Sequence, residues 1–316
     1  MKKKPLVSVG IFTYNQEQYI AQTIESVLLQ QCDFDYEILI GEDCGSDGTL
    51  KTCQKYADRY PDIIKLFARE KNLGMLENFC DIARKCQGKY IAFCAGDDYW
   101  IDKYKLQKQV DFLESNPNYA LVHTNFKLFI QKENKFDDVV FKRDVGYVFQ
   151  SYLKGNQIGA LTVLALRDIL LDGINQGFAN KFLMEDYPLW LYIAQSHKIG
   201  YLDDVTAVYR VLPESMSNTQ NKVKAAIFND SVLDVRVYFA EKNNCINLIL
   251  DDMVSAYKLQ LNFGFENRQI DLAEKSYQFL KRHKRVDYRC YTLYLGTKYN
   301  LFHLIKFAWK TKNRLI

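Results

Sequence analysis

The stretch KYIAFCAGDDYW, Lys89–Trp100, decides the fold of this 316-residue chain. Its first half, Tyr90–Ala95, is a short apolar run with β-branched and aromatic residues, which is the pattern of a strand buried on both faces. Gly96 then allows a sharp turn, and two adjacent carboxylates follow, Asp97 and Asp98. Because neighbouring acids repel each other, we expect this pair at the exposed carboxyl end of the strand, where it can share a cation that prefers oxygen ligands. The alternative is a solvated turn that caps the next helix.

The sequence before this stretch alternates between strand and helix patterns. The predicted strands are Leu6–Phe12, Tyr36–Ile40, Ile63–Ala68 and Lys89–Ala95, with helical spacing in each interval between them. Strict alternation implies right-handed crossovers and a mainly parallel central sheet flanked by helices, as in Rossmann-like α/β folds. Ligands of such sheets bind at the carboxyl ends of the strands. Three polar loops are therefore expected on one edge: Thr13-Tyr14-Asn15, Glu42-Asp43 and Asp97-Asp98.

The pattern changes after a polar run that follows Pro213. We place a domain boundary there, between an α/β domain of residues 1–212 and a helical C-terminal region of residues 213–316. Helical periodicity in this region is clearest in Val223–Ala240, Ile246–Phe263, Ile270–Arg282 and Tyr299–Lys312. The helices can form hairpins, but no internal repeat is convincing from the sequence. In the first domain, polar Gln131–Arg143 is expected to be an exposed loop or hairpin.

Composition argues against several classes of protein. The formal net charge of +4 is too small to argue for nucleic acid as a partner. The eight Cys residues form no CxxC pair and no zinc pattern, which favours reduced thiols in a cytoplasmic protein. The basic start, Met1–Lys4, leads into a strand rather than a signal peptide, and no apolar run reaches the roughly 20 residues that span a bilayer. We therefore expect neither a secreted nor an integral membrane protein.

Five segments occur in an order and at separations that resemble glycosyltransferase family 2, over roughly residues 5–212. They are VSVGIFTYN (Val7–Asn15), EILIGEDCGSDGT (Glu37–Thr49), REKNLGMLENF (Arg69–Phe79), GKYIAFCAGDDYW (Gly88–Trp100) and MEDYPLW (Met184–Trp190). The resemblance implies the GT-A fold and a metal-dependent hexosyltransferase that inverts the anomeric configuration. The donor would be a nucleotide-diphosphate sugar, with UDP-sugar favoured. The acceptor would be a saccharide or lipid-linked hydroxyl, as in capsule, O-antigen or other cell-surface polysaccharide synthesis.

The resemblance assigns the first two loops to the nucleotide. Thr13, Tyr14, Asn15 and Asn72 would line its pocket, and Asp43 would accept a hydrogen bond from the imide N–H of uracil or thymine. This role suits an ionised carboxylate, which accepts hydrogen bonds and donates none. For Asp43 the alternative is a turn-forming Asx residue.

The segment GDD corresponds to the metal motif of the family, commonly Asp-x-Asp followed by another Asp. Ala95 stands at the first Asp position, which leaves Asp97 as the expected ligand of Mn²⁺ or Mg²⁺. One carboxylate can suffice, because such ions are often bound largely through substrate phosphates. Asp98 would support the site or contact the donor sugar. Arg210 would neutralise the leaving diphosphate.

The segment MEDYPLW supplies the expected catalytic acids. Asp186 matches the position of the general base of the family, which would take the proton of the acceptor hydroxyl as that oxygen attacks opposite the diphosphate. Glu185 would tune the pKa of Asp186, because repulsion between two neighbouring carboxylates raises the pKa of one of them. The alternative is an acidic first turn that interacts favourably with the helix dipole.

Basic and aromatic residues are combined in the C-terminal segment 299–316. A helix of this kind can lie in a membrane interface, so the segment is a candidate for peripheral contact at the inner face of the plasma membrane. The alternative is a helix docked on its own domain. Two other functional interpretations stay open. One is a catalytically degenerate glycosyltransferase-like binding subunit, which Ala95 favours. The other is a nucleotidyltransferase making nucleotide sugars, for which the glycine-rich phosphate loop is missing after the first strand.

Overall fold

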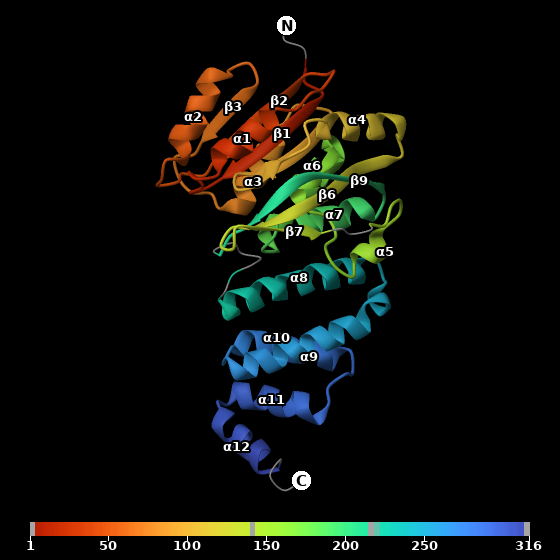
Figure 1. Cartoon of the computed structure of the whole chain (residues 1–316). Coiled ribbons are helices and arrows are strands. Elements are labelled where there is room, and N and C mark those ends of the chain that lie inside the picture. The colour runs from red at the N-terminus through yellow and green to blue at the C-terminus, as the bar shows by residue number, and fades with distance from the viewer. Residues whose placement is uncertain (1–3, 140–142, 214–218, 220, 313–316) are drawn as a thin grey trace. The chain divides into compact units, whose positions relative to one another are not determined.

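The computed structural model describes residues 4–139, 143–213, 219 and 221–312. The chain divides into two compact units, Met1–Ser215 and Met216–Ile316. The first unit contains the sheet with its covering helices, and the elements of the second are helices (Figure 1).

The sheet of the first unit has nine strands in the order β3-β2-β1-β4-β8-β6-β9-β5, with β7 paired to β6. The first four strands of the chain pair in parallel; they are β1 (Val7–Thr13), β2 (Tyr36–Glu42), β3 (Ile64–Ala68) and β4 (Tyr90–Ala95). β1 and most of β4 are buried along their length, as the apolar runs predict. Their carboxyl ends form one edge.

Helices cover both faces of these parallel strands. α1 (Ile20–Leu28) places Ile20 and Ile24 in the same core cluster as Val9 of β1. On the other face, the Phe79 ring of α3 (Met75–Lys85) lies 4.4 Å, centroid to centroid, from the Phe93 ring of β4. α2 (Thr49–Arg59) connects β2 to β3. Because both faces are covered, these strands are mostly apolar, and the polar side chains of Ser8, Glu37 and Lys65 bind one another near the amino ends of the strands.

The strands after β4 make the sheet mixed. β8 (Leu164–Leu166) is antiparallel to both β4 and β6 (Tyr119–Ile130), whereas β9 (Lys198–Val211) runs parallel to β6. β5 (Tyr99–Trp100) is antiparallel to β9, and β7 (Lys135–Val139) forms a hairpin with β6. The predicted α/β architecture is confirmed, with the parallel pairing concentrated in the first half of the chain. Residues 140–142 of the expected loop or hairpin lie outside the described residues.

Short helices complete the first unit. They are α4 (Lys105–Ser115), α5 (Phe149–Tyr152), η1 (Ala160–Thr162), α6 (Arg167–Asn175), η2 (Phe178–Asn180) and α7 (Asp186–Ala194). α7 is almost entirely buried, which explains why its sequence is apolar on all sides. Its first turn is the exception and carries the acid pair Glu185 and Asp186.

The second unit consists of helices that follow one another along the chain (Figure 1). They are α8 (Lys222–Lys242), η4 (Ile246–Leu248), α9 (Leu250–Glu266), α10 (Ile270–Arg282), α11 (Tyr288–Lys298) and α12 (Phe302–Lys312). α11 was not predicted. Stacked rings join successive helices, with Tyr257 4.2 Å from Phe279 and Tyr277 4.0 Å from Tyr294. Across the described part of the chain, none of the helices combines the length and apolarity that crossing a bilayer requires.

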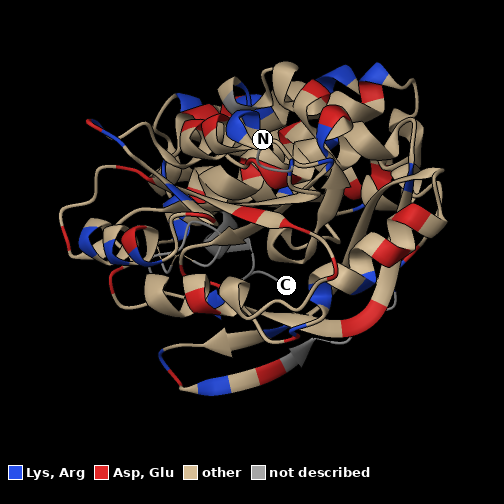
Figure 2. Ribbon diagram, turned by 90° about the horizontal axis from the view of Figure 1, so that it is seen from above, with Lys and Arg blue, Asp and Glu red and all other residues tan. Residues whose placement is uncertain are grey.

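Charged residues of both signs are interspersed over the described ribbon (Figure 2). This distribution agrees with the small formal net charge of +4. The sequence of the last helices is an exception, because basic residues dominate there.

Candidate functional site

The carboxyl ends of β1, β2 and β4 bring the three predicted polar loops together. The backbone N–H of Asp43 donates to the Thr13 carbonyl oxygen at 3.0 Å, and the N–H of Gly96 donates to the Phe12 carbonyl oxygen at 3.0 Å. A Cβ atom at Gly96 would lie 2.5 Å from Thr13 Oγ1, so only glycine permits this close approach of the loops. Loops far apart in sequence thus form one continuous rim.

The first loop is tied to the second by side chains. Thr13 is buried and its Oγ1 donates to Gln16 Oε1 at 2.8 Å. Asn15 adopts a left-handed conformation with φ of 51°, which Asn tolerates, and its Oδ1 accepts the Ser46 N–H at 2.8 Å. Between them, Tyr14 projects with 48% of its surface exposed. An exposed ring beside fixed polar groups is compatible with the predicted nucleotide pocket.

Asp43 holds the turn that starts α3. Its Oδ1 accepts the N–H of Leu73 at 2.7 Å and its Oδ2 accepts the N–H of Gly74 at 2.9 Å. Asn72 Oδ1 accepts the same Gly74 N–H at 2.8 Å. The carboxylate therefore bridges segments 30 residues apart and does not form a local Asx turn. Each carboxylate oxygen retains a second lone pair with which it can accept from a ligand.

The acidic pair after β4 sits in a loop whose backbone is fixed. Thr23 Oγ1 lies 2.9 Å from the carbonyl oxygen of Gly96 and 2.6 Å from that of Asp98, and donates to them. The Asp98 carboxylate is buried and accepts the backbone N–H of Arg210 at 2.8 Å. Burial, and next the charge of Asp97, raise the pKa of Asp98 well above its usual range. Asp97 itself is half-buried.

Arg210 binds this loop rather than projecting freely. Its Nε donates to the Asp97 carbonyl oxygen at 2.8 Å, Nη1 to Gln131 Oε1 at 2.7 Å and Nη2 to Gln22 Oε1 at 2.7 Å. The guanidinium carbon also lies 4.7 Å from the centroid of the Tyr19 ring. Only 6% of the residue is exposed. The cation therefore lies against the acidic loop, with its donors directed to protein acceptors.

The acidic loop offers part of what a divalent cation requires. Among the described residues, no three or more His, Cys, Asp or Glu side chains are grouped so that they could hold a metal ion. Asp97 and Asp98 nevertheless place two carboxylates side by side, and the charge of the first contributes to the raised pKa of the second. A cation beside them would offset that repulsion, with its remaining ligands supplied by diphosphate oxygens and water. This donor set fits Mn²⁺ or Mg²⁺ bound largely through the substrate.

The second acid pair lies at the start of α7. Both side chains are half-buried, and Asp186 Oδ2 accepts from Asn156 Nδ2 at 3.0 Å. Burial, and then the charge of Asp186, raise the pKa of Glu185 to about 8. Burial also raises the pKa of Asp186, which hydrogen bonds from the Tyr187 N–H and Asn156 partly oppose. Two coupled carboxylates with raised pKa values are suited to accept a proton near neutral pH.

The charge of the second pair is felt at Cys80 of α3. Burial raises the pKa of Cys80, on α3, to about 11, and the nearby charge of Glu185 contributes to that increase. α3 begins at the turn that Asp43 holds. The charge of Glu185 therefore acts on the helix whose first turn Asp43 holds.

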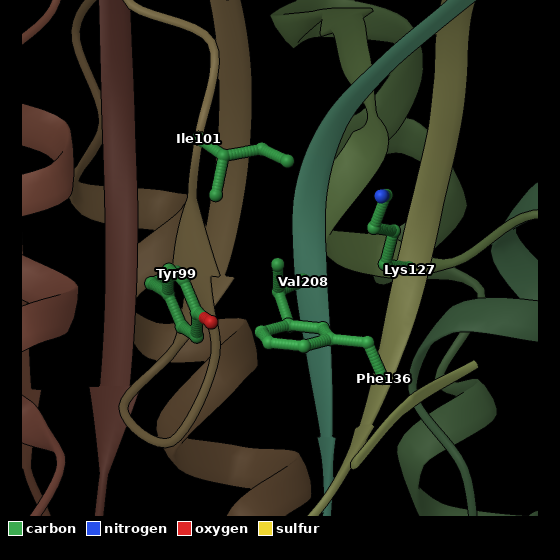
Figure 3. A pocket seen from close by; sticks show the side chains of 5 residues that line it. All are labelled: Tyr99, Ile101, Lys127, Phe136 and Val208. Carbon is green, nitrogen blue, oxygen red and sulfur yellow. The ribbon is translucent and has the colours of Figure 1, made fainter. Parts of the chain in front are cut away.

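A hollow of about 320 Å³ lies over β5, β9, β6 and β7 (Figure 3). It is lined by Tyr99, Ile101, Lys127, Phe136 and Val208. Tyr99 and Val208 face each other across the β5–β9 ladder, and Val208 is paired with Lys127 in β6. The lining contains no carboxylate, but Tyr99 directly follows Asp98, and its ring centroid lies 5.4 Å from the guanidinium carbon of Arg210.

The structure adds residues that sequence patterns did not identify. Gln22 and Gln131 hold Arg210, and Asn156 orients Asp186. These three amides belong to no recognisable motif. Glu42, by contrast, was expected on the rim beside Asp43, and its buried Oε1 accepts the Gly45 N–H at 2.7 Å.

The chain is similar to several known proteins. Residues 8–151 match the family model described as Glycosyl transferase family 2. An uncharacterized protein of Mycobacterium tuberculosis (strain ATCC 25618 / H37Rv) is 31% identical over 207 residues, which are 65% of this chain and 58% of the relative. The chain thus spans less than two thirds of the length of that relative. UDP-Glc:alpha-D-GlcNAc-diphosphoundecaprenol beta-1,3-glucosyltransferase WfgD of Escherichia coli is 30% identical over 219 residues, 69% of this chain and 81% of WfgD.

The fold has a counterpart among solved structures. The crystal structure of S. aureus TarS 1-349 in complex with UDP superposes with a TM-score of 0.62 and 17% identity, covering 94% of this chain and 88% of that chain. This likeness confirms the predicted GT-A fold. With the match to the family model and the similarity to WfgD, it shows that the chain belongs to glycosyl transferase family 2.

Proposed function

We propose that the protein is an inverting glycosyltransferase that moves a sugar from a nucleotide-diphosphate donor, most simply a UDP-sugar, to an acceptor hydroxyl. The observation that carries the proposal is the coupled acid pair at the start of α7, with raised pKa values and with Asn156 bound to Asp186. Membership of family 2 supplies the reaction class. The name of WfgD, which acts on a lipid-linked saccharide, supports a lipid-linked saccharide as acceptor.

In this proposal Asp186 is the general base. It takes the proton of the acceptor hydroxyl while the acceptor oxygen bonds to the anomeric carbon and the bond from that carbon to the diphosphate breaks. Attack from the side opposite the leaving group inverts the configuration. Because the pKa of Glu185 is about 8, Glu185 stays protonated at neutral pH and leaves the ionised role to Asp186. A base so placed contributes about 10²–10⁴-fold to the rate.

The donor would lie along the rim of the sheet. Thr13, Tyr14, Asn15, Asp43 and Asn72 would contact the nucleotide, with Asp43 selecting a base that offers an imide N–H. Asp97, supported by Asp98, would hold Mn²⁺ or Mg²⁺, which supplies positive charge to the leaving diphosphate. Arg210 would assist by holding the loop in place and adding its charge behind it.

The test compares two acids in equivalent positions. Asp186 and Asp168 both lie in the first turn of a helix, but the side chain of Asp168 is 86% exposed. With UDP-, GDP- and dTDP-sugars, Mn²⁺ and an alkyl-diphosphate-linked N-acetylglucosamine, Asp186→Asn should lower transfer about 10²–10⁴-fold without changing UDP binding. Asp168→Asn should retain the wild-type rate. The proposal fails if no donor is transferred or hydrolysed, or if both variants behave alike.

A further inference from the structure

The two acids at the start of α7 receive different hydrogen bonds. Asp186 Oδ1 accepts the backbone N–H of Tyr187 at 2.6 Å, and Asp186 Oδ2 accepts Asn156 Nδ2 at 3.0 Å. For Glu185, the hydrogen bond among the described residues that opposes the raised pKa comes from its own backbone N–H. Hydrogen bonds donated to a carboxylate stabilise its ionised form, so this difference favours a negative charge on Asp186.

Asn156 is oriented as a donor to Asp186 because a second contact fixes its amide group. Its Oδ1 accepts the backbone N–H of Ile158 at 3.1 Å. A flipped amide would turn its NH₂ group to that N–H and its oxygen to the Asp186 carboxylate, which would oppose donor to donor and acceptor to acceptor. The loop therefore directs the Asn156 Nδ2 to the acid, and a donor in this position favours the ionised carboxylate.

Trp190 brings a third donor to the same carboxylate. It lies one helical turn after Asp186 on α7, so the two side chains share a face of the helix. The residue is 0% exposed, and its Nε1 has no hydrogen-bond acceptor among the described residues. It does lie near enough to the Asp186 carboxylate to help lower its pKa. A buried indole N–H without an acceptor is uncommon and requires a reason, and this group can only donate.

The charged groups on the elements around α7 are engaged with other partners. On α3, Cys80 is neutral because burial raises its pKa to about 11, and Arg84 pairs with Glu77 at 3.0 Å. On the elements that pack against α7, the pairs are Tyr152 of α5 with His123, Asp168 and Asp172 of α6 with Arg167 and Tyr192, and Tyr201 and Lys198 of β9 with Asp203 and the Tyr119 ring. Within the described part of the chain, the pKa of Asp186 is therefore lowered by hydrogen-bond donors rather than by a cation.

We infer that Asn156 and Trp190 are positioning residues that assign the negative charge of the acid pair to Asp186 and the shared proton to Glu185. The inference rests on the proposed function, in which Asp186 is the general base. Without the two donors, little more than the intrinsic difference of about 0.4 pKa unit between Asp and Glu would separate the acids. The proton would then be shared between them, and only part of the molecules would carry an ionised base.

The experiment follows the two carboxyl groups directly and needs no sugar. The full chain, labelled with ¹³C at the side-chain carboxyl carbons of Asp and Glu, is titrated by NMR from about pH 4 to about pH 9. Asp186→Asn and Glu185→Gln identify the two signals. In the wild type, the Asp186 carbon should change in the lower titration step and the Glu185 carbon in the upper one. In Asn156→Ala/Trp190→Phe, each carbon should change in both steps, and the midpoint of Asp186 should rise by about 1 pH unit.

Two control variants remove comparable groups elsewhere. Gln157→Ala removes the neighbouring amide, which binds Ser151 Oγ at 3.0 Å. Trp100→Phe removes another buried indole N–H, which donates to the Leu161 oxygen at 2.9 Å. Both should leave the midpoint of Asp186 in place. In urea unfolding Trp100→Phe should also lower stability more than Trp190→Phe does, because it leaves a carbonyl oxygen without its donor.

Several results would overturn the inference. They are a midpoint of Asp186 that is the same in the wild type and the double variant, a wild type in which Glu185 titrates in the lower step, and a shift in Gln157→Ala as large as that in Asn156→Ala alone. Where the wild type transfers sugar, the low-pH limb of the rate should move to higher pH in Asn156→Ala, because the base must be ionised. If the carboxyl groups titrate as expected but no donor is transferred, the proposed function fails and the inference stands.

Discussion

Replacing Lys105 by Met should stabilise the protein at neutral pH and destabilise it at high pH. Lys105 is 0% exposed, and its Nζ donates to Gln109 Oε1 at 2.7 Å and lies 4.2 Å from the centroid of the Trp100 ring. Burial lowers the pKa of this lysine to about 7, with only partial opposition from Cys94 and Asp102. The folded protein therefore holds an ammonium group in a site that disfavours its charge.

The size of the effect follows from proton binding. In the unfolded chain a lysine has a pKa near 10.4, so between about pH 7 and 10.4 the unfolded state binds one proton more than the folded state. Stability therefore rises with pH across this window, by about 1.4 kcal/mol for each of about 3.5 pH units. Burying the charged lysine thus costs about 4–5 kcal/mol below pH 7 and nothing above pH 10.4.

The methionine variant removes that cost but also removes a hydrogen bond. Gln109 Oε1 would be left without its donor, at a cost of about 1–3 kcal/mol. We therefore expect a gain of about 2–3 kcal/mol near pH 6, which should decrease as the pH rises and become a loss of about 1–3 kcal/mol near pH 10. The distinctive feature is that the difference in unfolding free energy between variant and wild type changes sign with pH. An ordinary core substitution changes the unfolding free energy by the same amount at every pH.

Urea unfolding of wild type and Lys105→Met between about pH 6 and pH 10 measures this difference. Lys51→Met is the control, because Lys51 is exposed on α2 and its replacement should have little effect at any pH. A difference in unfolding free energy that stays constant with pH, or a variant that is less stable than wild type at pH 6, would refute the reasoning.

Two further substitutions test the acid pair and the rim. Glu185→Gln replaces a carboxyl group that is protonated at neutral pH by a neutral amide, so the pKa of Asp186 and the low-pH limb of the transfer rate should stay in place; a limb that moves to lower pH in the pH–rate profile would contradict this. Gly96→Ala places a Cβ 2.5 Å from Thr13 Oγ1 and should lower stability by about 1–3 kcal/mol in urea unfolding, whereas Gly155→Ala, with nothing within 4 Å, should be nearly neutral. Equal stability of the two alanine variants would argue against the close packing of the rim.

The first half of the fold could be predicted because its signals are local. The buried run Tyr90–Ala95 and the glycine after it define β4 and its turn, and the same pattern marks β1 and β2. β8 gives no such signal, because Leu164–Leu166 is too short for periodicity and its pairing with β4 and β6 depends on tertiary contacts. The sequence therefore did not predict whether the later strands run parallel or antiparallel to their neighbours.

The same distinction applies to the site. The acids stand next to strand and helix ends, where sequence patterns point to them. Sequence patterns do not point to the partners of Arg210, because Gln22 and Gln131 lie 188 and 79 residues away from it and belong to no motif. The second unit contains the same turn twice, closed by a 2.8 Å bond from the Gln269 N–H to the Gly264 oxygen and by another from the Leu301 N–H to the Gly296 oxygen, and this repeat was missed for a similar reason. It rests on Gly264 and Gly296 and on turn geometry, whereas the intervening side chains differ.

The network around Arg210 explains how the loop is held although Ala95 stands at the position of the first carboxylate. Every carbonyl oxygen from Gly96 to Asp98 accepts a hydrogen bond from a side chain, two of them from Thr23 of α1 and one from Arg210 of β9. The loop is therefore held in one conformation before any ligand arrives, and little conformational entropy remains to be lost on binding. In the proposed function, such rigidity would favour a cation held by few protein oxygens, because the backbone that carries the carboxylates would need no rearrangement to meet it. In this arrangement Arg210 acts mainly by fixing the position of the acids.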